Sequence, residues 1–276
     1  MKRACVIGWP IQHSRSPLIH GHWLAQYGIA GTYTREAVKP EDVGTFLSSL
    51  ADRGFAGCNV TLPHKHAALA AAVHKDAAAI AIGAANTLWL EDGVLHAANT
   101  DAYGFMTHLS QSIPDWQAVD APVSILGAGG AARALIHGFL EAGIDEIRLF
   151  NRTPARAEDL ARHFGPRVTP HAWTDRERLS RDVGVLVNTT ALGMIHGEPL
   201  DMDVSRLGQR TIVADIVYVP LETPLLAAAR HRGLRTVDGL GMLLHQAVPG
   251  FEKWFGRKPE VTPELRALLV ADIEGR

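Results

Sequence analysis

The first hundred residues of the chain alternate short apolar runs with segments that carry helix signals. Short apolar runs bounded by turn residues are typical of buried strands. Helix signals are a proline in the first turn and a glycine just beyond the last turn. The strands predicted in this way are 4–8, 32–38 and 55–60, and the predicted helices are 17–27, 40–53 and an alanine-rich segment from Pro63 onward. This alternation indicates βαβ units with parallel strands.

A β-hairpin is predicted at the end of this first series. Two apolar runs, 86–90 and 94–98, are separated by Glu91-Asp92-Gly93. An Asp-Gly pair is typical of a tight hairpin turn, because both turn positions take a positive φ. The first sheet is therefore expected to be mixed.

A second alternating series begins near residue 122. It opens with a strand at 123–126, a glycine-rich turn at 127–130 and a helix at 131–142. Further strand-like runs, with helical patterns between most of them, occur at 147–150, 183–187, 211–216 and 234–237. These five runs predict a parallel domain of the Rossmann type, whose complete form has six strands.

Two helices, at 240–255 and 262–273, follow this domain and are expected to pack back on the first one. The polar stretch 110–121 is the predicted boundary between the two series. The expected fold is therefore α/β with two domains. The first comprises residues 1–103 and 238–276, and the second comprises residues 104–237.

Bulk composition narrows the class of protein. A chain of 276 residues with 47% hydrophobic and 20% charged residues has the composition of a soluble globular protein. The net charge of −2 gives no polyanion-binding pattern, so nucleic acid is not expected as a partner. Cys5 and Cys58 lie in apolar runs and no signal-peptide pattern precedes them, so we expect no disulfide framework and a cytoplasmic location. No membrane partner is expected.

Residues 123–132 match a dinucleotide-binding fingerprint. A strand leads into Gly127-Ala128-Gly129-Gly130, and Ala132 occupies the third small position of GxGxxA. The glycines permit a tight turn and let the backbone approach a pyrophosphate at the helix N-terminus. Because a strand precedes this turn and a helix follows it, a dinucleotide site is favoured over an unrelated glycine turn.

The end of the next strand predicts NADP as the dinucleotide. An NAD site has an acidic residue there, about 20 residues beyond the glycines. This chain has Asn151-Arg152-Thr153 instead, with Arg156 one helical turn later. Each charge-assisted contact to a 2′-phosphate contributes roughly 1.5–3 kcal/mol, and arginines near a helix N-terminus oppose the helix dipole. The alternative is that both arginines are ordinary exposed residues.

Four loop segments of the first series gather polar side chains suited to a small polyhydroxy acid. Ser14 and Ser16 lie near a helix N-terminus, where they suit a carboxylate, although Ser16 alone is also explained as a helix N-cap. Lys65 is unfavourably placed in the first turn of a helix, and Asp101 is predicted to pair with it. The segments are 13–17, 59–65, 83–87 and 99–101.

Eight segments, in order, resemble those of the shikimate dehydrogenase family. They span residues 13–247 and read HSRSP, NVTLPHK, GAANT, NTDAYG, GAGGAA, NRT, DIVYVP with TPLL, and DGLGMLLHQA. The resemblance implies reversible, NADPH-dependent reduction of 3-dehydroshikimate to shikimate in aromatic amino acid biosynthesis. It also implies that the first domain binds substrate and the second binds NADP.

The resemblance further implies the site residues. Lys65 and Asp101 would be the catalytic pair, with the Lys65 ammonium stabilising and protonating the developing alkoxide. The other implied substrate-binding residues are Ser14, Ser16, Thr61, Asn86, Tyr218 and Gln246. The implied cofactor-binding residues are Gly127, Ala128, Gly129, Gly130, Ala131, Asn151, Arg152, Thr153, Arg156, Thr189, Met194, Ile216, Gly239 and Met242.

The chain departs from the family pattern at Gly21 and at Thr190-Ala191. These departures bear on substrate fine-tuning and not on the reaction class.

Three alternatives remain open. One alternative is a quinate/shikimate dehydrogenase, another is a paralogue with a different natural substrate, and the third is a non-catalytic NADP- or shikimate-sensing module. Retention of Lys65 and Asp101 argues against the third.

No HExxH or CxxC motif occurs, so a catalytic metal is not expected. Monomer and homodimer are both open.

Overall fold

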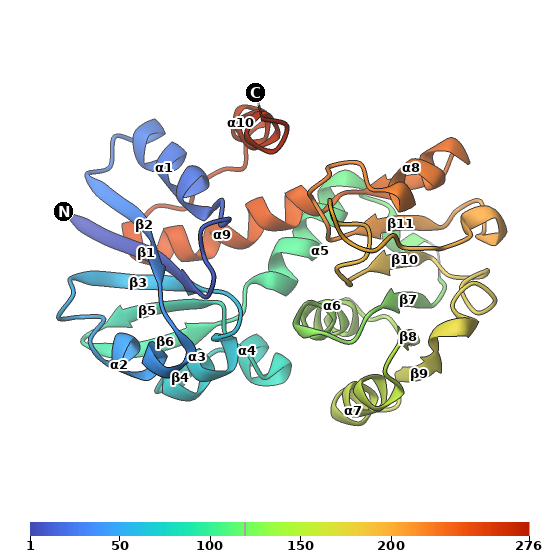
Figure 1. The fold of residues 1–276 in the computed structure, drawn as a ribbon, viewed down its shortest axis with the longest axis horizontal. Helices are drawn as coiled ribbons and strands as arrows, with labels where there is room; N and C mark the ends of the chain where they lie inside the picture. The colour runs from blue at the N-terminus through green and yellow to red at the C-terminus, as the bar shows by residue number, and fades with distance from the viewer. Residues whose placement is uncertain (119, 276) are drawn as a thin grey trace. The chain divides into compact units, whose positions relative to one another are not determined.

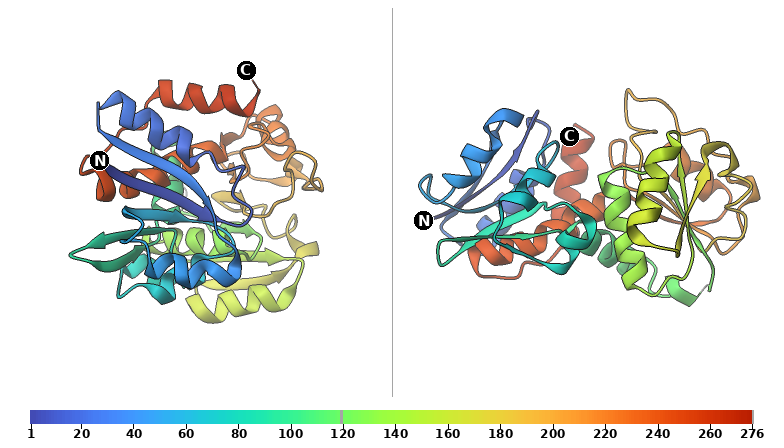
Figure 2. Two further views of the ribbon diagram at one scale, coloured as in Figure 1. Left: turned by 60° about the vertical axis from the view of Figure 1, so that its left-hand side comes forward. Right: turned by 90° about the horizontal axis from the view of Figure 1, so that it is seen from below.

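Two six-stranded sheets organise the computed structural model, which describes residues 1–118 and 120–275 (Figures 1 and 2). Residue 119 belongs to the predicted boundary stretch, and residue 276 ends the predicted C-terminal segment. Both lie outside the described residues. The chain divides into two units, each with its own sheet. The first unit is residues 1–101 with 244–276, and the second is residues 102–243.

The sheet of the first unit is mixed, as predicted, with strand order β2-β1-β3-β5-β6-β4. Strand β1 pairs in parallel with β2 and β3, whereas β5 is antiparallel to β3 and β6. Asp92 and Gly93 take φ values of 51° and 78°, so the predicted Asp-Gly hairpin is confirmed. The strands are β1 (Lys2–Gly8), β2 (Gly31–Ala37), β3 (Phe55–Val60), β4 (His74–Lys75), β5 (Thr87–Glu91) and β6 (Val94–Ala98).

Helices cover both faces of this sheet. Helix α1 and the C-terminal part of α9 lie on one face, while α2 and α3 pack on the other face (Figure 1). Trp23 of α1 and Phe251 and Trp254 of α9 are fully buried. Cys5 and Cys58 are buried free thiols on β1 and β3. The helices are α1 (Ser16–Gln26), α2 (Val43–Ser48), α3 (Lys65–Ala71), α4 (Ala77–Ile82), α9 (Gly239–Phe255) and α10 (Pro263–Ile273).

Two helix predictions in this unit were wrong in extent. The segment 40–53 forms a 3₁₀ turn at Pro40–Asp42 followed by α2, which already ends at Ser48. The alanine-rich segment is not one helix, because β4 interrupts it by pairing with β6. Asp76 then starts α4 as its N-cap, with Oδ1 accepting the Ala79 N–H at 2.6 Å. An aspartate before an alanine run is the local signal for this second start.

The sheet of the second unit is wholly parallel, with order β12-β11-β10-β7-β8-β9, which confirms the Rossmann-type prediction. Helices α6 and α7 lie on one face and α8 on the other, because the right-handed crossovers run in opposite directions from β7 (Figure 1). The strands are β7 (Val123–Leu126), β8 (Ile147–Asn151), β9 (Val168–Ala172), β10 (Val185–Asn188), β11 (Ile212–Asp215) and β12 (Arg235–Val237), and the helices are α6 (Gly130–Glu141), α7 (Pro154–Phe164) and α8 (Pro224–His231).

Two further elements were missed by sequence reasoning. Strand β9 contains Pro170, which argues against a strand except at an edge, and β9 is an edge strand. Helix α5 (Asp101–Ser112) starts in a predicted loop and runs into the predicted boundary stretch. Its buried positions Ala102, Phe105 and Leu109 have helical spacing, but the polar residues around them obscured the pattern. No described helix combines the length and the hydropathy that a membrane crossing requires.

Candidate active site

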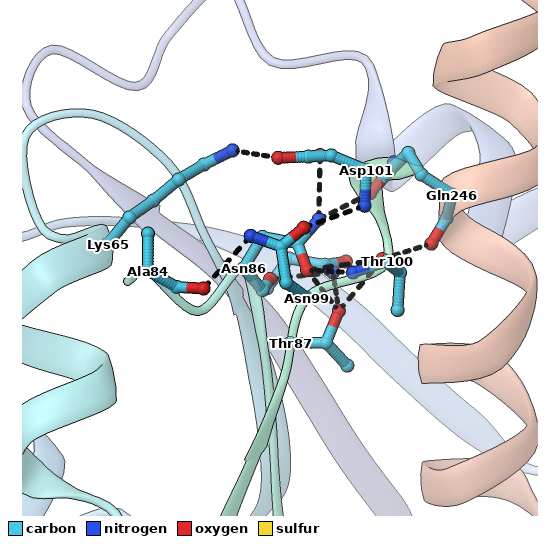
Figure 3. A network of polar contacts seen from close by, with 9 residues as sticks. Lys65, Ala84, Asn86, Thr87, Asn99, Thr100, Asp101 and Gln246 are labelled. Carbon is cyan, nitrogen blue, oxygen red and sulfur yellow. Dashed lines mark hydrogen bonds and ion pairs between the residues drawn. The ribbon is translucent and has the colours of Figure 1, made fainter. Parts of the chain in front are cut away.

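Lys65 and Asp101 meet at the carboxyl edge of the first sheet. Lys65 is the first residue of α3, shortly after β3, and Asp101 is the first residue of α5. The two side chains point toward one another, with Nζ 2.5 Å from Oδ2 (Figure 3). Their side chains are only 23% and 12% exposed, so their attraction is screened less than that of a surface pair. The predicted pairing is confirmed.

The Asp101 carboxylate is held at both oxygens. Oδ1 accepts a hydrogen bond from Asn86 Nδ2 at 2.8 Å, and Oδ2 faces Lys65. The Asp101 backbone N–H donates to Asn99 Oδ1 at 3.0 Å, and Asn99 Nδ2 donates to the Ala84 carbonyl at 2.9 Å. The carboxylate is therefore fixed in position and orientation. It in turn holds the Lys65 ammonium, which has three N–H donors.

Asn86 has a role that sequence reasoning missed. Its Oδ1 accepts the Thr100 backbone N–H at 2.8 Å, which leaves Nδ2 facing Asp101. Gln246 Oε1 lies 3.5 Å from the same nitrogen. Asn86 thus orients the Asp101 carboxylate, and its contact with a substrate hydroxyl stays a prediction.

The two serines of the first loop also lie together. Ser14 Oγ and Ser16 Oγ are 3.3 Å apart, and the Ser16 N–H donates to Ser14 Oγ at 3.4 Å. The interpretation of Ser16 as the N-cap of α1 was wrong, because Arg15 occupies that position and Ser16 is the first helical residue. A cavity of about 490 Å³ adjoins Ser14, with Arg15, Arg35 and Asp272 in its lining.

The predicted site residues divide between the two units. Besides Lys65 and Asp101, six substrate-binding residues were predicted, and these six do not all belong to the same unit. In the first unit, Thr61 follows β3 and is half-buried, whereas Tyr218 follows β11 in the second unit and is half-buried there. Every predicted cofactor-binding residue belongs to the second unit. Among the described residues, no three His, Cys, Asp or Glu side chains form a group that would hold a metal ion.

The glycine turn leaves an open helix N-terminus. Gly127 has a φ of +105°, and a Cβ there would lie 2.8 Å from Thr189 Oγ1, so both conformation and space require glycine. Gly129 is the N-cap of α6 without a side-chain capping bond. A Cβ on Gly129 or Gly130 would meet no described heavy atom within 4 Å. Backbone N–H groups at such an open end suit a pyrophosphate.

The end of β8 combines a structural residue with an exposed cation. Asn151 Oδ1 accepts the Ala128 N–H at 3.2 Å, and its Nδ2 donates to the Thr153 carbonyl at 2.8 Å. Asn151 therefore fixes the glycine turn. Arg152 Nη1 lies 2.8 Å from Glu198 Oε2, and these side chains are 62% and 70% exposed. Glu198 was missed by sequence reasoning because it is distant from Arg152 along the chain.

A buried carboxylate organises the loops after β10 and β11. Asp215 accepts hydrogen bonds from Asn188 Nδ2 at 2.9 Å, the Val217 N–H at 3.0 Å and Thr223 Oγ1 at 2.7 Å. Burial raises the pKa of Asp215 to about 6 despite these three donors. Sequence reasoning missed Asp215, although an aspartate that ends an apolar strand is itself a signal.

The predicted nicotinamide-side residues lie on or beside these loops. Thr189 Oγ1 donates to the Leu126 carbonyl at 2.7 Å, which ties the end of β10 to the glycine turn. A Cβ on Gly239 would lie 2.2 Å from the Ile216 carbonyl oxygen, so Gly239 allows close packing there. Met194 is 47% exposed and Met242 is half-buried.

These features place the protein in the class of two-domain, dinucleotide-dependent oxidoreductases. Family models match most of the chain: the shikimate dehydrogenase substrate binding domain at residues 6–88, shikimate/quinate 5-dehydrogenase at 108–238, and the shikimate 5′-dehydrogenase C-terminal domain at 239–269. The chain belongs to the shikimate dehydrogenase family.

Named relatives and solved structures agree with this assignment. The chain is 55% identical over 276 residues to shikimate dehydrogenase (NADP(+)) of Azorhizobium caulinodans, covering 100% of this chain and 98% of that protein. It is 57% identical over 272 residues to the Mesorhizobium japonicum protein of the same name, covering 99% and 97%.

Two solved structures show the same fold over nearly the full length. The Thermus thermophilus shikimate 5-dehydrogenase in complex with NADP(H) and shikimate has a TM-score of 0.86 at 36% identity, covering 98% of this chain and 100% of that chain. The Corynebacterium glutamicum quinate dehydrogenase in complex with NAD has a TM-score of 0.91 at 30% identity, covering 98% and 99%.

Proposed function

We propose that the protein is an NADP-dependent shikimate dehydrogenase that interconverts 3-dehydroshikimate and shikimate. The observation that carries this proposal is the Lys65–Asp101 ion pair, held by Asn86, in a chain 55% identical over its full length to a shikimate dehydrogenase (NADP(+)). The amine and the carboxylate argue against a non-catalytic sensing module, which needs neither. The reaction belongs to aromatic amino acid biosynthesis.

The second unit fits NADP at both ends of the dinucleotide. The uncapped N-terminus of α6 offers backbone N–H groups for the pyrophosphate, with Gly127, Ala128, Gly129, Gly130 and Ala131 around it. Arg152 and Arg156 are exposed guanidinium groups that suit a 2′-phosphate, beside Asn151 and Thr153. We assign the nicotinamide side to Thr189, Met194, Ile216, Gly239 and Met242.

We assign the first domain, residues 1–103 with 238–276, to substrate binding and catalysis, and residues 104–237 to NADP binding. Ser14 and Ser16 would receive the substrate carboxylate, because adjacent hydroxyl donors at a helix start suit an anion. Thr61, Asn86 and Gln246 would contact the ring hydroxyls. Asn86 and Gln246 are within 3.5 Å of one another, so they reach a common point.

Proton transfer is assigned to Lys65. When bound, NADPH supplies the hydride that the ring carbonyl carbon receives. The carbonyl oxygen then gains negative charge, which the Lys65 ammonium stabilises and neutralises by donating a proton. Asp101 fixes the Lys65 side chain in place through the contact between Oδ2 and Nζ. In the oxidising direction the neutral Lys65 amine accepts the proton from the substrate hydroxyl.

A quinate/shikimate dehydrogenase is the second candidate, because the quinate dehydrogenase in complex with NAD has a TM-score of 0.91 to this chain. Spectrophotometric assays of the purified protein with shikimate or quinate, each with NADP or NAD, separate the two. We expect the highest kcat/KM for shikimate with NADP. Preference for quinate with NAD would support the second candidate, and no turnover of either acid would refute both.

We also propose a cytoplasmic location. Cys5 and Cys58 are register partners on the neighbouring strands β1 and β3, and both are free thiols. Two adjacent cysteines kept as thiols fit a reducing compartment. Localisation of the tagged protein by cell fractionation tests this, and enrichment in an extracytoplasmic fraction would contradict it.

A further inference from the structure

Four buried side chains form a continuous series of hydrogen bonds that ends on the Asp101 carboxylate. Tyr33, Asn59, Thr87 and Asn86 are between 1% and 8% exposed and come from or adjoin β2, β3 and β5. We call these four residues the donor chain. Of the four, only Asn86 was expected to contact substrate.

The orientation of both amides in the donor chain is fixed by the backbone. Asn86 Oδ1 must face Thr100, because it accepts that residue's N–H at 2.8 Å. Asn59 Nδ2 must face Asn86, because it donates to that residue's carbonyl at 3.2 Å. Backbone N–H and C=O groups have one role each, so neither amide can be turned around without losing a bond.

With the amides fixed, every bond donates in one direction. Tyr33 Oη donates to Asn59 Oδ1 at 2.6 Å, and Asn59 Nδ2 donates to Thr87 Oγ1 at 3.2 Å. Thr87 Oγ1 then donates to Asn86 Oδ1 at 3.1 Å, and Asn86 Nδ2 donates to Asp101 Oδ1 at 2.8 Å. Successive bonds of the same sense polarise one another, and a buried site of low dielectric strengthens this.

The far end of the donor chain is also fixed. The His20 ring stacks on Tyr33 with centroids 4.0 Å apart and planes 11° apart. Burial raises the pKa of Tyr33 well above 10, so the phenol keeps its proton and stays a donor. The nearby Ser16 side chain, which the proposed function assigns to the substrate carboxylate, offsets part of this rise in the pKa of Tyr33.

We propose that Tyr33, Asn59 and Thr87 are positioning residues, which orient Asn86 and through it hold Asp101 and Lys65 in the geometry needed for proton transfer. The inference rests on the proposed function for its kinetic consequence, although the hydrogen-bond geometry stands independently. Because these residues act behind the reacting groups, their loss should affect kcat more than KM.

Thr87 gives the sharpest test, because valine keeps its shape without the hydroxyl and serine keeps the hydroxyl. For Thr87→Val we expect kcat for shikimate oxidation to fall about tenfold, because losing one buried hydrogen bond disturbs the alignment of Lys65 and Asp101. We expect KM for shikimate to change less than about threefold. Thr87→Ser should stay within about twofold of the parent enzyme. Equal kcat values for the two variants would overturn the proposal.

A second readout does not depend on turnover. The chain has five asparagines, at positions 59, 86, 99, 151 and 188, so selective ¹⁵N-asparagine labelling gives few side-chain amide signals. The signals of Asn59 and Asn86 should shift in Thr87→Val and return in Thr87→Ser. Asn151 and Asn188, in the second unit, serve as internal controls. Unchanged Asn86 signals in Thr87→Val would overturn the donor chain.

Tyr33→Phe covers the case in which Thr87→Val does not fold. It removes one hydroxyl at the start of the donor chain, and we expect a fall in kcat of about threefold and a shift of the Asn59 amide signal. An unshifted Asn59 signal would contradict the proposal. Absence of shikimate turnover in the parent enzyme would instead contradict the proposed function, and the amide signals would still test the donor chain.

Discussion

Arg152 and Glu198 form an ion pair at the end of β8, with Nη1 2.8 Å from Oε2. Both side chains are more than half exposed, and such pairs contribute little to stability. The pair therefore has more bearing on what Arg152 binds than on the fold. The Glu198 carboxylate pairs with the Arg152 guanidinium, which the proposed function assigns to the 2′-phosphate of NADP. The carboxylate and the phosphate therefore compete for the same guanidinium.

Glu198→Gln should therefore tighten NADP binding. Removing the competing charge frees Arg152, and we expect KM for NADP to fall about threefold while KM for NAD stays unchanged. Asp159→Asn is the matched control, because Asp159 forms a similarly exposed pair with Arg162 on α7. Steady-state kinetics with both cofactors measure the effect. A weaker affinity for NADP in Glu198→Gln would show that the carboxylate positions Arg152 instead.

Arg152→Ala should reduce the discrimination between NADP and NAD. Loss of a charge-assisted contact worth roughly 1.5–3 kcal/mol corresponds to a fall of about 10- to 100-fold in the ratio of kcat/KM for NADP to that for NAD. Arg162→Ala, at another exposed position of the same unit, is the control. An unchanged ratio in Arg152→Ala would remove Arg152 from the cofactor site.

Lys65→Ala should impair turnover far more than binding. The substitution removes the proposed proton donor, and general acid–base catalysis contributes about 10²–10⁴-fold to rate. We expect kcat to fall by that amount with little change in KM for shikimate. Lys75→Ala, at an exposed position on β4, is the control. A near-normal kcat in Lys65→Ala would refute its assignment as the acid.

Asp215 should make stability depend on pH. Its pKa in the folded state, about 6, lies above the ordinary value of 3.8, so the folded state binds this proton more tightly than the unfolded state. The stabilisation is full below pH 3.8 and is lost as pH rises through 6. The difference in pKa corresponds to about 3 kcal/mol in total, with about 1 kcal/mol of it lost between pH 5 and pH 7.5.

Asp215→Asn tests this, because the amide cannot ionise. Urea denaturation at pH 5 and at pH 7.5 gives the free energy of unfolding of both proteins. We expect the parent protein to lose about 1 kcal/mol relative to Asp215→Asn between these two pH values. Parallel pH dependence in the two proteins would show that Asp215 is ionised throughout this range.

The sequence by itself determined the features that depend on neighbouring residues. The Asp92-Gly93 turn, the glycine turn at Gly127 and the position of Lys65 at a helix start each follow from local backbone preferences. Alternation of apolar runs and helix signals was enough to predict a mixed sheet followed by a parallel one. These preferences act over a few residues, so they can be recognised in the order of the amino acids.

Only the tertiary structure decided which distant side chains meet. Glu198 reaches Arg152, and Asn86 donates to Asp101, because strand order and loop path place these side chains together. Pro170 is tolerated in β9 because that strand lies at a sheet edge, which depends on how the other strands pair. Burial and hydrogen-bond partners are properties of the folded chain, and no local preference specifies them.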